Sequence, residues 1–417
     1  MSVRRTKIVA TLGPASNSPE VLEQLILAGI DVARLNFSHG TPDEHRARAR
    51  LVRELAAKHG RFVALLGDLQ GPKIRIAKFA NKRIELQVGD KFRFSTSHAR
   101  DAGTQEVVGI DYPDLVKDCG VGDELLLDDG RVVMVVEEVA ADELRCRVLI
   151  GGPLSDHKGI NRRGGGLTAP ALTDKDKADI KLAADMDLDY VAVSFPRDAK
   201  DMEYARRNNK VVITATQMME SMIHSPMPTR AEVSDVANAV LDYTDAVMLS
   251  AESAAGEYPV EAVKAMARVC QGAEKHPTSQ KSSHRLGQTF DRCDESIALA
   301  SMYTANHFPG IKAIICLTES GFTPLIMSRI RSSVPIYAYS PHRETQARVA
   351  MFRGVETIPF DPAALPAEKV SQAAVDELLK RGVVTKGDWV ILTKGDSYTA
   401  QGGTNTMKVL HVGDLLV

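Results

Sequence analysis

Long apolar runs and paired cysteines are both missing from this sequence of 417 residues. No stretch approaches the roughly 20 apolar residues of a membrane-spanning helix. The apolar run near the N-terminus stops at Gly13-Pro14, too early for a signal peptide. The cysteines are odd in number and scattered, with no CxxC pair: Cys119, Cys146, Cys270, Cys293 and Cys316. These absences argue against a disulfide framework, a zinc site and a membrane partner, and they predict a cytoplasmic protein.

A strong charge of either sign is also absent, since 52 Lys and Arg residues stand against 54 Asp and Glu residues. The formal net charge of -2 offers no electrostatic reason for binding nucleic acid or a membrane surface. Neither a Walker A sequence nor GxGxxG occurs, so the common nucleotide fingerprints do not apply. Any anion must therefore be bound by a local site.

Strand and helix patterns alternate at the start of the chain and again after residue 174, which predicts a parallel sheet covered by helices. Between these two stretches, from Ile74 to about Ile150, the runs are short, β-rich and separated by turn signals. They predict a small all-β domain inserted into the α/β domain. Six strands are expected in the α/β part, ending at Leu12, Asn36, Asp68, Phe195, Thr216 and Ser250.

The polar stretch from His276 is the best linker candidate, and a further α/β unit follows it. The predicted domains are a barrel-type domain at 1–71 and 167–275, a β lid at 72–166, a linker at 276–290 and a C-terminal α/β domain at 291–417.

Polar residues follow the second and third strands, where a parallel barrel collects its chemistry. Arg34 offers a planar fork for phosphate, and Asn36, Ser38 and His39 offer short polar contacts. Turn and capping chemistry would explain the same residues. After the third strand, Asp68, Lys73 and Arg75 stand beside the start of the insert. They could form a hinge salt-bridge cluster, although a domain boundary is also where clefts form.

Two later strand ends carry weaker signals. Thr216 and Gln217 are the polar candidates in a methionine-rich segment whose methionines are expected in the core. Ser250 and Glu252 follow the last strand of the barrel, and a helix N-cap pair is the plainer interpretation.

The C-terminal unit carries the sequence Thr318 to Pro324 between a strand and a helix. Its hydroxyl groups and backbone N–H groups could cradle a phosphate. A loop rich in Gly, Ser and Thr, Lys394 to Asn405, could fold over it. A capped helix beside a flexible loop is the alternative.

Taken together, these strings closely resemble the pyruvate kinase family. The matching pieces are Lys7–Ser16, Arg34–Gly40, Asp68–Arg75, Ala215–Met222 and Met248–Glu252, and their order and spacing also match. The resemblance implies a (β/α)8 TIM-type barrel with an inserted all-β lid domain and a C-terminal α/β domain, usually assembled as a homotetramer. It implies phosphoryl transfer from phosphoenolpyruvate to ADP, giving pyruvate and ATP, with Mg2+ as cofactor.

The resemblance also implies roles for individual residues. Arg34 would bind the transferring phosphoryl group, and Asn36, His39, Arg75 and the lid residue Lys158 would contact nucleotide phosphates. Thr216 would lie beside the carbon that is protonated, and Ser250 with Glu252 would support a proton-relaying water network. The loop with Thr318, Ser320 and Thr323 resembles the family's site for a sugar-phosphate or nucleotide effector.

The monovalent-cation region of the family corresponds to Asn36, Ser38, Asp68, Leu69 and Lys73. Potassium-dependent relatives carry Glu where Lys73 stands and a hydroxyl residue where Leu69 stands. A fixed ammonium at Lys73 would do what a bound K+ does in those relatives, so K+ is expected not to be required.

One departure from the family is large. Its fifth barrel strand carries a Lys-aliphatic-Glu triplet and its sixth ends in Arg-Gly-Asp-Leu-Gly, and neither string occurs here. These strands supply the phosphoryl-stabilising lysine and the Mg2+ carboxylates, so no metal ligands can be assigned. We expect a segment to be missing at Arg207-Asn208, with the strands ending at Phe195 and starting at Val211 not neighbours in space. The alternative is a complete, catalytically inactive homologue that binds phosphorylated metabolites or partner subunits.

Overall fold

The computed structural model describes residues 4–71, 74–128, 130–165, 167–168, 172–192, 209–215, 218–280, 289–396 and 402–414. They group into two compact units. One unit holds residues 1–68, 182–192 and 205–417, and the other holds residues 69–181 and 193–204. The first unit thus contains both the barrel strands and the C-terminal α/β part. The boundaries predicted for three domains remain a prediction.

The barrel part is a parallel sheet of six strands in the order β12-β3-β2-β1-β14-β13. Its strands are β1 (Lys7–Leu12), β2 (Val32–Asn36), β3 (Ala64–Asp68), β12 (Tyr190–Ala192), β13 (Ile213–Thr214) and β14 (Ala246–Leu249). The register runs Val9 to Val32 between β1 and β2, and Lys7 to Ala246 between β1 and β14. Because all strands are parallel, their carboxyl ends meet along one edge, as the sequence pattern predicted.

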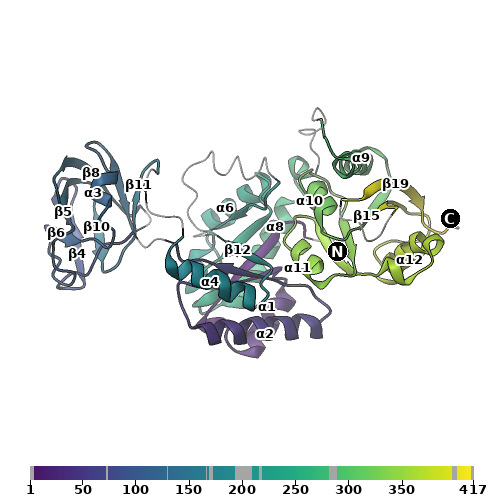
Figure 1. Cartoon of the computed structure of the whole chain (residues 1–417), viewed down its shortest axis with the longest axis horizontal. Helices are drawn as coiled ribbons and strands as arrows, with labels where there is room; N and C mark the ends of the chain where they lie inside the picture. Colours follow the sequence, from purple (N-terminus) through teal and green to yellow (C-terminus); the bar gives the residue numbers. More distant parts are fainter. Residues whose placement is uncertain are drawn as a thin grey trace. The chain divides into compact units, whose positions relative to one another are not determined.

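Helix caps in the sequence explain where the outer helices of this sheet begin. The Ser18 side chain accepts from the N–H of Val21 at the start of α1 (Pro19–Ala28), which ends at Gly29 with φ of 109°. A capping box between Thr41 and Glu44 starts α2 (Pro42–Lys58). Helices α6 (Arg230–Leu241) and α8 (Pro259–Ala273) pack on each other, and α8 packs on β1 and α1 (Figure 1).

Burial separates the middle of this sheet from its ends. Every residue of β1, β3 and β14 is buried, whereas no residue of β12 or β13 is. Val191 of β12 is 41% exposed. The strands containing Tyr190 and Ile213 lie at opposite ends of the sheet order and do not pair among the described residues, and their separation in space stays a prediction. Residues 193–208, including the Arg207-Asn208 junction, lie outside the described part.

The inserted unit is a mostly antiparallel β structure, in which β5 and β6 pair in parallel. Six strands pair in the order β11-β7-β8-β9-β5-β6, and two more pair as β10-β4. They are β4 (Arg83–Leu86), β5 (Lys91–Ser95), β6 (Val107–Gly109), β7 (Glu124–Leu127), β8 (Val132–Val139), β9 (Glu143–Ile150), β10 (Gly152–Ser155) and β11 (Ile160–Arg162). One short helix, α3 (Leu115–Asp118), interrupts the strands, which the sequence pattern had not predicted. Helix α4 (Asp174–Asp185) follows the insert.

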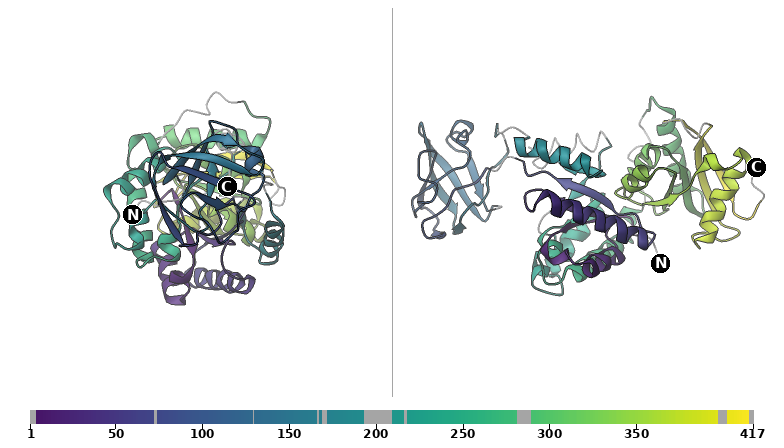
Figure 2. Two further views of the ribbon diagram at one scale, coloured as in Figure 1. Left: turned by 90° about the vertical axis from the view of Figure 1, so that its left-hand side faces the viewer. Right: turned by 60° about the horizontal axis from the view of Figure 1, so that its bottom comes forward.

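The C-terminal part is a five-stranded sheet in the order β17-β16-β15-β18-β19. Its strands are β15 (Ile311–Leu317), β16 (Ile336–Ser340), β17 (Val355–Pro359), β18 (Trp389–Gly395) and β19 (Thr404–His411). Helices α9 (Cys293–His307) and α10 (Phe322–Ser328) cover one face, and α12 (Ala367–Lys380) covers the other. Figure 2 shows this sheet between its helices. The antiparallel β19 was not predicted, because its first residues were assigned to the glycine-rich loop.

Within the described residues, no helix combines the length and apolar character needed to cross a membrane.

Candidate active site and effector pocket

Arg34 lies at the centre of a network that joins the carboxyl ends of three strands. Its Nε donates to the Asp68 carboxylate at 2.7 Å, and its Nη2 lies 2.5 Å from the same carboxylate. Its Nη1 donates to Thr11 Oγ1 at 2.8 Å. These contacts use three of the five N–H groups of the guanidinium, whose planar fork matches phosphate geometry. The sequence therefore supplies a largely buried, oriented cation at the strand ends.

Thr11 was not among the residues singled out from the sequence, yet it connects this network to β14. Its hydroxyl donates to the carbonyl of Leu249 at 2.9 Å, and its own carbonyl accepts from the Ser253 hydroxyl at 2.9 Å. Both residues are buried. The signal available in the sequence was a hydroxyl residue at the end of the first strand, next to the Gly13-Pro14 turn.

Ser250 and Glu252 begin the short helix α7 (Ala251–Ala254) after β14. The Glu252 carboxylate is 2% exposed and accepts from the backbone N–H groups of Ser250, at 2.7 Å, and Met219, at 3.2 Å. The carboxylate therefore ties the segment after β13 to the segment after β14. Ser250 is the N-cap residue of α7, but its side chain makes no capping hydrogen bond, and its position after β14 puts it at the same edge of the sheet as Arg34.

The segment after β2 is a compact turn. Asn36 Oδ1 accepts from the N–H of Ser38 at 3.0 Å, and the N–H of His39 donates to the Asn36 carbonyl at 3.2 Å. The His39 carbonyl lies 2.9 Å from Nε2 of the buried His45. Turn chemistry thus accounts for the backbone here, while the register of β2 and β3 places Asn36 opposite Asp68. Leu69, the residue after Asp68, is buried.

Lys73, Thr216 and Gln217 lie outside the described residues. In the described segment that follows Gln217 in the sequence, Glu232 accepts from the hydroxyl and N–H of Ser221 and from Thr229. Burial alone would raise the pKa of Glu232, but these hydrogen bonds outweigh it and lower the pKa. A fixed carboxylate therefore holds the turn Glu220–Ile223 that follows the methionine-rich segment.

Arg75 and Lys158 lie close together within the inserted unit. Arg75 pairs with Gly159 in an isolated β-bridge, and the N–H of Ile76 donates to the Lys158 carbonyl at 3.0 Å. The Lys158 ammonium lies 2.7 Å from Asp128. The two predicted phosphate contacts are therefore adjacent on one unit, and Lys158 would exchange Asp128 for a ligand.

The start of the insert is held by a carboxylate. Asp176 accepts from the N–H of Gly71 at 2.9 Å and from the hydroxyl and N–H of Thr173. Burial alone would raise the pKa of Asp176, but these hydrogen bonds outweigh it and lower the pKa. The two ends of the insert are thus tied together within the same unit.

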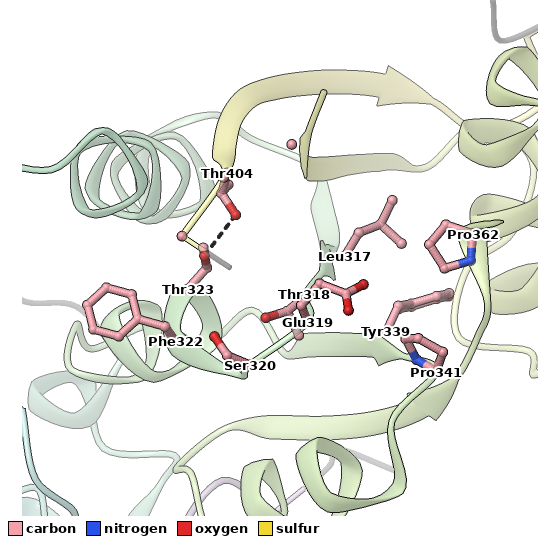
Figure 3. A pocket seen from close by; sticks show the side chains of 13 residues that line it. Leu317, Thr318, Glu319, Ser320, Phe322, Thr323, Tyr339, Pro341, Pro362 and Thr404 are labelled. Carbon is pink, nitrogen blue, oxygen red and sulfur yellow. Dashed lines mark hydrogen bonds between the residues drawn. The ribbon is translucent and has the colours of Figure 1, made fainter. Parts of the chain in front are cut away.

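A small pocket of about 30 Å3 lies in the C-terminal part and is lined by the predicted effector residues (Figure 3). Thr318, Ser320 and Thr323 all line it, and Thr404 of β19 completes it. The Thr323 and Thr404 hydroxyls are 2.9 Å apart, and the Thr318 hydroxyl accepts from the N–H of Gly321 at 3.0 Å. The structure thus gathers the three predicted hydroxyl residues around one cavity.

The comparisons with known proteins decide the family. The barrel-domain model of pyruvate kinase matches residues 3–209 and 205–263, and the alpha/beta-domain model of pyruvate kinase matches residues 295–410. The chain belongs to the pyruvate kinase family. As a member of this family, the chain has a TIM-type barrel, a lid and a C-terminal α/β domain, and the six described parallel strands belong to the barrel.

Several curated relatives support this assignment. Pyruvate kinase II of Salmonella typhimurium is 48% identical over 476 aligned positions, covering 98% of this chain and 99% of the relative. Pyruvate kinase of Haemophilus influenzae is 46% identical and covers 97% of each chain. Pyruvate kinase of Geobacillus stearothermophilus is 37% identical, covering 99% of this chain and 81% of the relative.

Among the residues that the structure describes, few acidic side chains at the strand ends could bind Mg2+. Of the acidic residues expected at the strand ends, Asp68 is paired with Arg34 and Glu252 accepts two backbone N–H groups. Within the described ranges, no group of three or more His, Cys, Asp or Glu side chains could hold a metal ion. Because protein-bound Mg2+ is usually held by one or two carboxylates together with phosphate oxygens, and both carboxylates here already have other partners, the described residues do not fit a Mg2+ site.

Proposed function

We propose that this protein functions as a pyruvate kinase, transferring the phosphoryl group of phosphoenolpyruvate to ADP to give pyruvate and ATP. The observation that carries this is the Arg34 network at the strand ends, in a chain nearly half identical to curated pyruvate kinases. Phosphoryl transfer depends on positioning and positive charge more than on covalent chemistry. An inactive homologue has no support in the comparisons.

The proposed roles follow the geometry. Arg34 binds the transferring phosphoryl group with those guanidinium N–H groups that do not contact Asp68 or Thr11. Ser250 and Glu252 organise the edge at which enolpyruvate is protonated, together with Thr216. Asn36 and His39 from the barrel, and Arg75 and Lys158 from the lid, contact the nucleotide phosphates.

Mg2+ is the cofactor expected of the family, but the described residues bring no group of carboxylates together to hold it. We therefore attribute the phosphoryl-stabilising lysine and the Mg2+ carboxylates of the active enzyme to a segment that this sequence lacks. No step is assigned to the metal in the chain as it stands.

Pyruvate formation, followed spectroscopically, tests this proposal. The full-length enzyme should be active, and Arg34→Ala should lower kcat/KM at least ~100-fold, since it removes a positioned cation from the reacting phosphoryl group. Arg46→Ala is the matched control, because Arg46 is an exposed arginine of α2 paired only with Asp43. An Arg34→Ala enzyme with unchanged kcat/KM would contradict the role.

We further propose that the pocket of Thr318, Ser320, Thr323 and Thr404 binds a phosphorylated sugar or nucleotide that regulates the enzyme. Three hydroxyl residues around one cavity support this, because hydroxyl groups donate hydrogen bonds to phosphate oxygens. Ser320→Asp should abolish effector activation by repulsion while basal activity stays. Ser320→Thr is the control, and unchanged activation in Ser320→Asp would contradict the assignment.

Potassium independence and a homotetrameric assembly complete the proposal. Lys73 is proposed to replace the monovalent cation of potassium-dependent relatives. Activity of the full-length enzyme should therefore not change when KCl replaces another chloride at constant ionic strength. A strong activation by KCl would contradict it, and light scattering would test the assembly.

A further inference from the structure

A pocket of about 520 Å3 lies against helix α2, and none of its residues belongs to the candidate active site or the effector pocket. Its volume is within the roughly 300–1,000 Å3 that is usual for small-molecule sites. All of its residues lie in one of the two compact units. Helix α2 supplies Arg46, Ala49, Arg50, Arg53, Glu54 and Ala57, and the other lining residues are Asp185 and Met186 near the end of α4 and Arg343 at the start of α11 (Arg343–Val349).

The arginines of α2 form a row on one face of the helix. Arg46, Arg50 and Arg53 are spaced by four and three residues, which places their side chains next to one another. Because an α-helix rises about 1.5 Å per residue, the row extends roughly 10 Å. Arg46 pairs with Asp43, but that pair is exposed and therefore weak. Arg343 adds a fourth guanidinium group to the same pocket.

Two of these guanidinium groups are free to bind a ligand. Within the described residues, the side chains of Arg50 and Arg343 form no hydrogen bond and no ion pair. A third group is held in place by the backbone, because Nη2 of Arg53 donates to the carbonyls of Met186, at 2.9 Å, and Asp187. Its other N–H groups stay available. A planar guanidinium fork matches the geometry of phosphate oxygens, so the pocket offers an anion several points of attachment.

The remaining lining residues indicate what else the ligand carries. Glu54 and Asp185 are the two carboxylates of the pocket, so the four arginines leave its formal charge positive. Carboxylates accept hydrogen bonds from hydroxyl groups. Ala49, Ala57 and Met186 add apolar surface. This lining suits an anion that is extended along α2, with room for a sugar beside it.

We propose that this arginine pocket, defined by Arg46, Arg50, Arg53 and Arg343, binds a linear chain of phosphate groups, either free or as part of a nucleoside triphosphate. A single phosphate group covers only part of a row that extends roughly 10 Å, whereas three linked phosphates contact successive arginines. The inference does not depend on the proposed function, because its test measures binding alone.

Protection from phenylglyoxal, a reagent that modifies guanidinium groups, tests the pocket in the chain of 417 residues. The probe is sodium tripolyphosphate at a fixed ionic strength, because salt screens charge contacts. With the probe in ~10-fold excess over its dissociation constant, modification of Arg50 and Arg343 should slow about 10-fold. Arg48 of the same helix hydrogen-bonds to Asn17 at 2.8 Å and does not line the pocket, so its rate should not change. Mass spectrometry of the peptides measures all three rates.

A matched pair of variants tests whether the arginines act as one site. Arg50→Ala removes a contact between charged groups, so the dissociation constant should rise at least ~10-fold and Arg343 should lose most of its protection at the same probe concentration. Arg48→Ala removes the same charge from α2 without changing the pocket lining, and Arg343 should stay protected. Arg50 is exposed, so its replacement should leave the fold intact, which circular dichroism verifies.

Two further probes identify the source of the phosphates. Stronger protection by ATP than by tripolyphosphate would indicate a nucleoside triphosphate, and equal or weaker protection would indicate the phosphate chain itself; both results uphold the pocket. Orthophosphate that protects as well as tripolyphosphate at equal concentration would overturn the proposal, because the row of arginines would then make no difference. Arginines that the probe does not protect would overturn it, as would the same protection of Arg343 in Arg50→Ala and Arg48→Ala.

Discussion

The C-terminal sheet and the barrel sheet are both open in the described structure, but they end differently. The C-terminal sheet ends in strands of five and eight residues, β17 and β19, and buried clusters cover both of its faces. The barrel sheet ends in strands of three and two residues, β12 and β13. On one of its faces, Ala350 and Met351 from the C-terminal part join the cluster of Val9, Val32, Ala64, Leu66, Ala246 and Met248. The first sheet thus ends in regular strands, whereas the described part of the second ends in two short strands that are not fully buried.

The largest expected effect is a difference in local stability between these two sheets. Amides in the middle of β15 and β18 should exchange at the rate set by global unfolding, while the amides of β12 and β13 should exchange with opening free energies near zero. Hydrogen exchange with mass spectrometry on the chain of 417 residues measures both in one sample. Equal protection of β12 and β15 would remove the distinction between the sheets.

Much of the barrel sheet and part of its candidate site could be predicted from the sequence. The strand ends predicted at Leu12, Asn36 and Asp68 match those of β1, β2 and β3. The network of Arg34 and Asp68 was also anticipated, because parallel strands bring their ends together. Two features were missed. The bridging role of Thr11 depends on a tertiary contact with Leu249, which the sequence does not show. Strand β19 begins inside a glycine-rich segment that the sequence pattern assigns to a loop.

The next prediction concerns Asp31, a buried carboxylate directly before β2 of the barrel sheet. Asp31 is paired with Arg4 at 2.8 Å and accepts from the N–H of Ile8 at 2.8 Å. Asp31→Asn should lower the free energy of unfolding of the barrel by about 3 kcal/mol, because it leaves a buried arginine unpaired. Urea denaturation measures the loss. Asp43→Asn, at an exposed pair, is the control and should change stability by less than about 1 kcal/mol.

The same carboxylate predicts a pH dependence. Burial alone would raise the pKa of Asp31, but the charges of Arg4 and Lys7 outweigh it and hold the pKa below its ordinary value. The stabilisation is therefore present above about pH 4 and is lost as the pH falls further. The Asp31→Asn substitution should flatten this acid loss in the barrel and leave that of the C-terminal sheet unchanged. An unaltered acid profile would contradict the assignment.

A matched pair of tyrosines compares a complete sheet with an edge. The Tyr339 hydroxyl, in β16, donates to the Ala374 carbonyl at 2.9 Å and is buried. The Tyr190 hydroxyl, in β12, donates to the Arg348 carbonyl. Tyr339→Phe should cost about 1–2 kcal/mol in global stability, since it removes a buried hydrogen bond and leaves only the helical one on the Ala374 carbonyl. Tyr190→Phe should cost less than about 0.5 kcal/mol, because an edge that already opens locally contributes little. Equal losses in urea denaturation would indicate that β12 is as firmly held as β16.

The smallest expected effect is on thiol reactivity. It compares Cys270, in a helix that packs on the barrel sheet, with Cys316, in the C-terminal sheet. Burial raises the pKa of Cys270, in α8 on the barrel, to about 12, and that of Cys316, in β15, to about 12. The thiolate is the reactive form, so both should resist a disulfide reagent at about pH 8, whereas the exposed Cys293 should react at once. In low urea, Cys270 should begin to react before Cys316, because the interrupted barrel opens first. Mass spectrometry of the labelled peptides gives the order, and simultaneous labelling of Cys270 and Cys316 would show that the two sheets unfold as one.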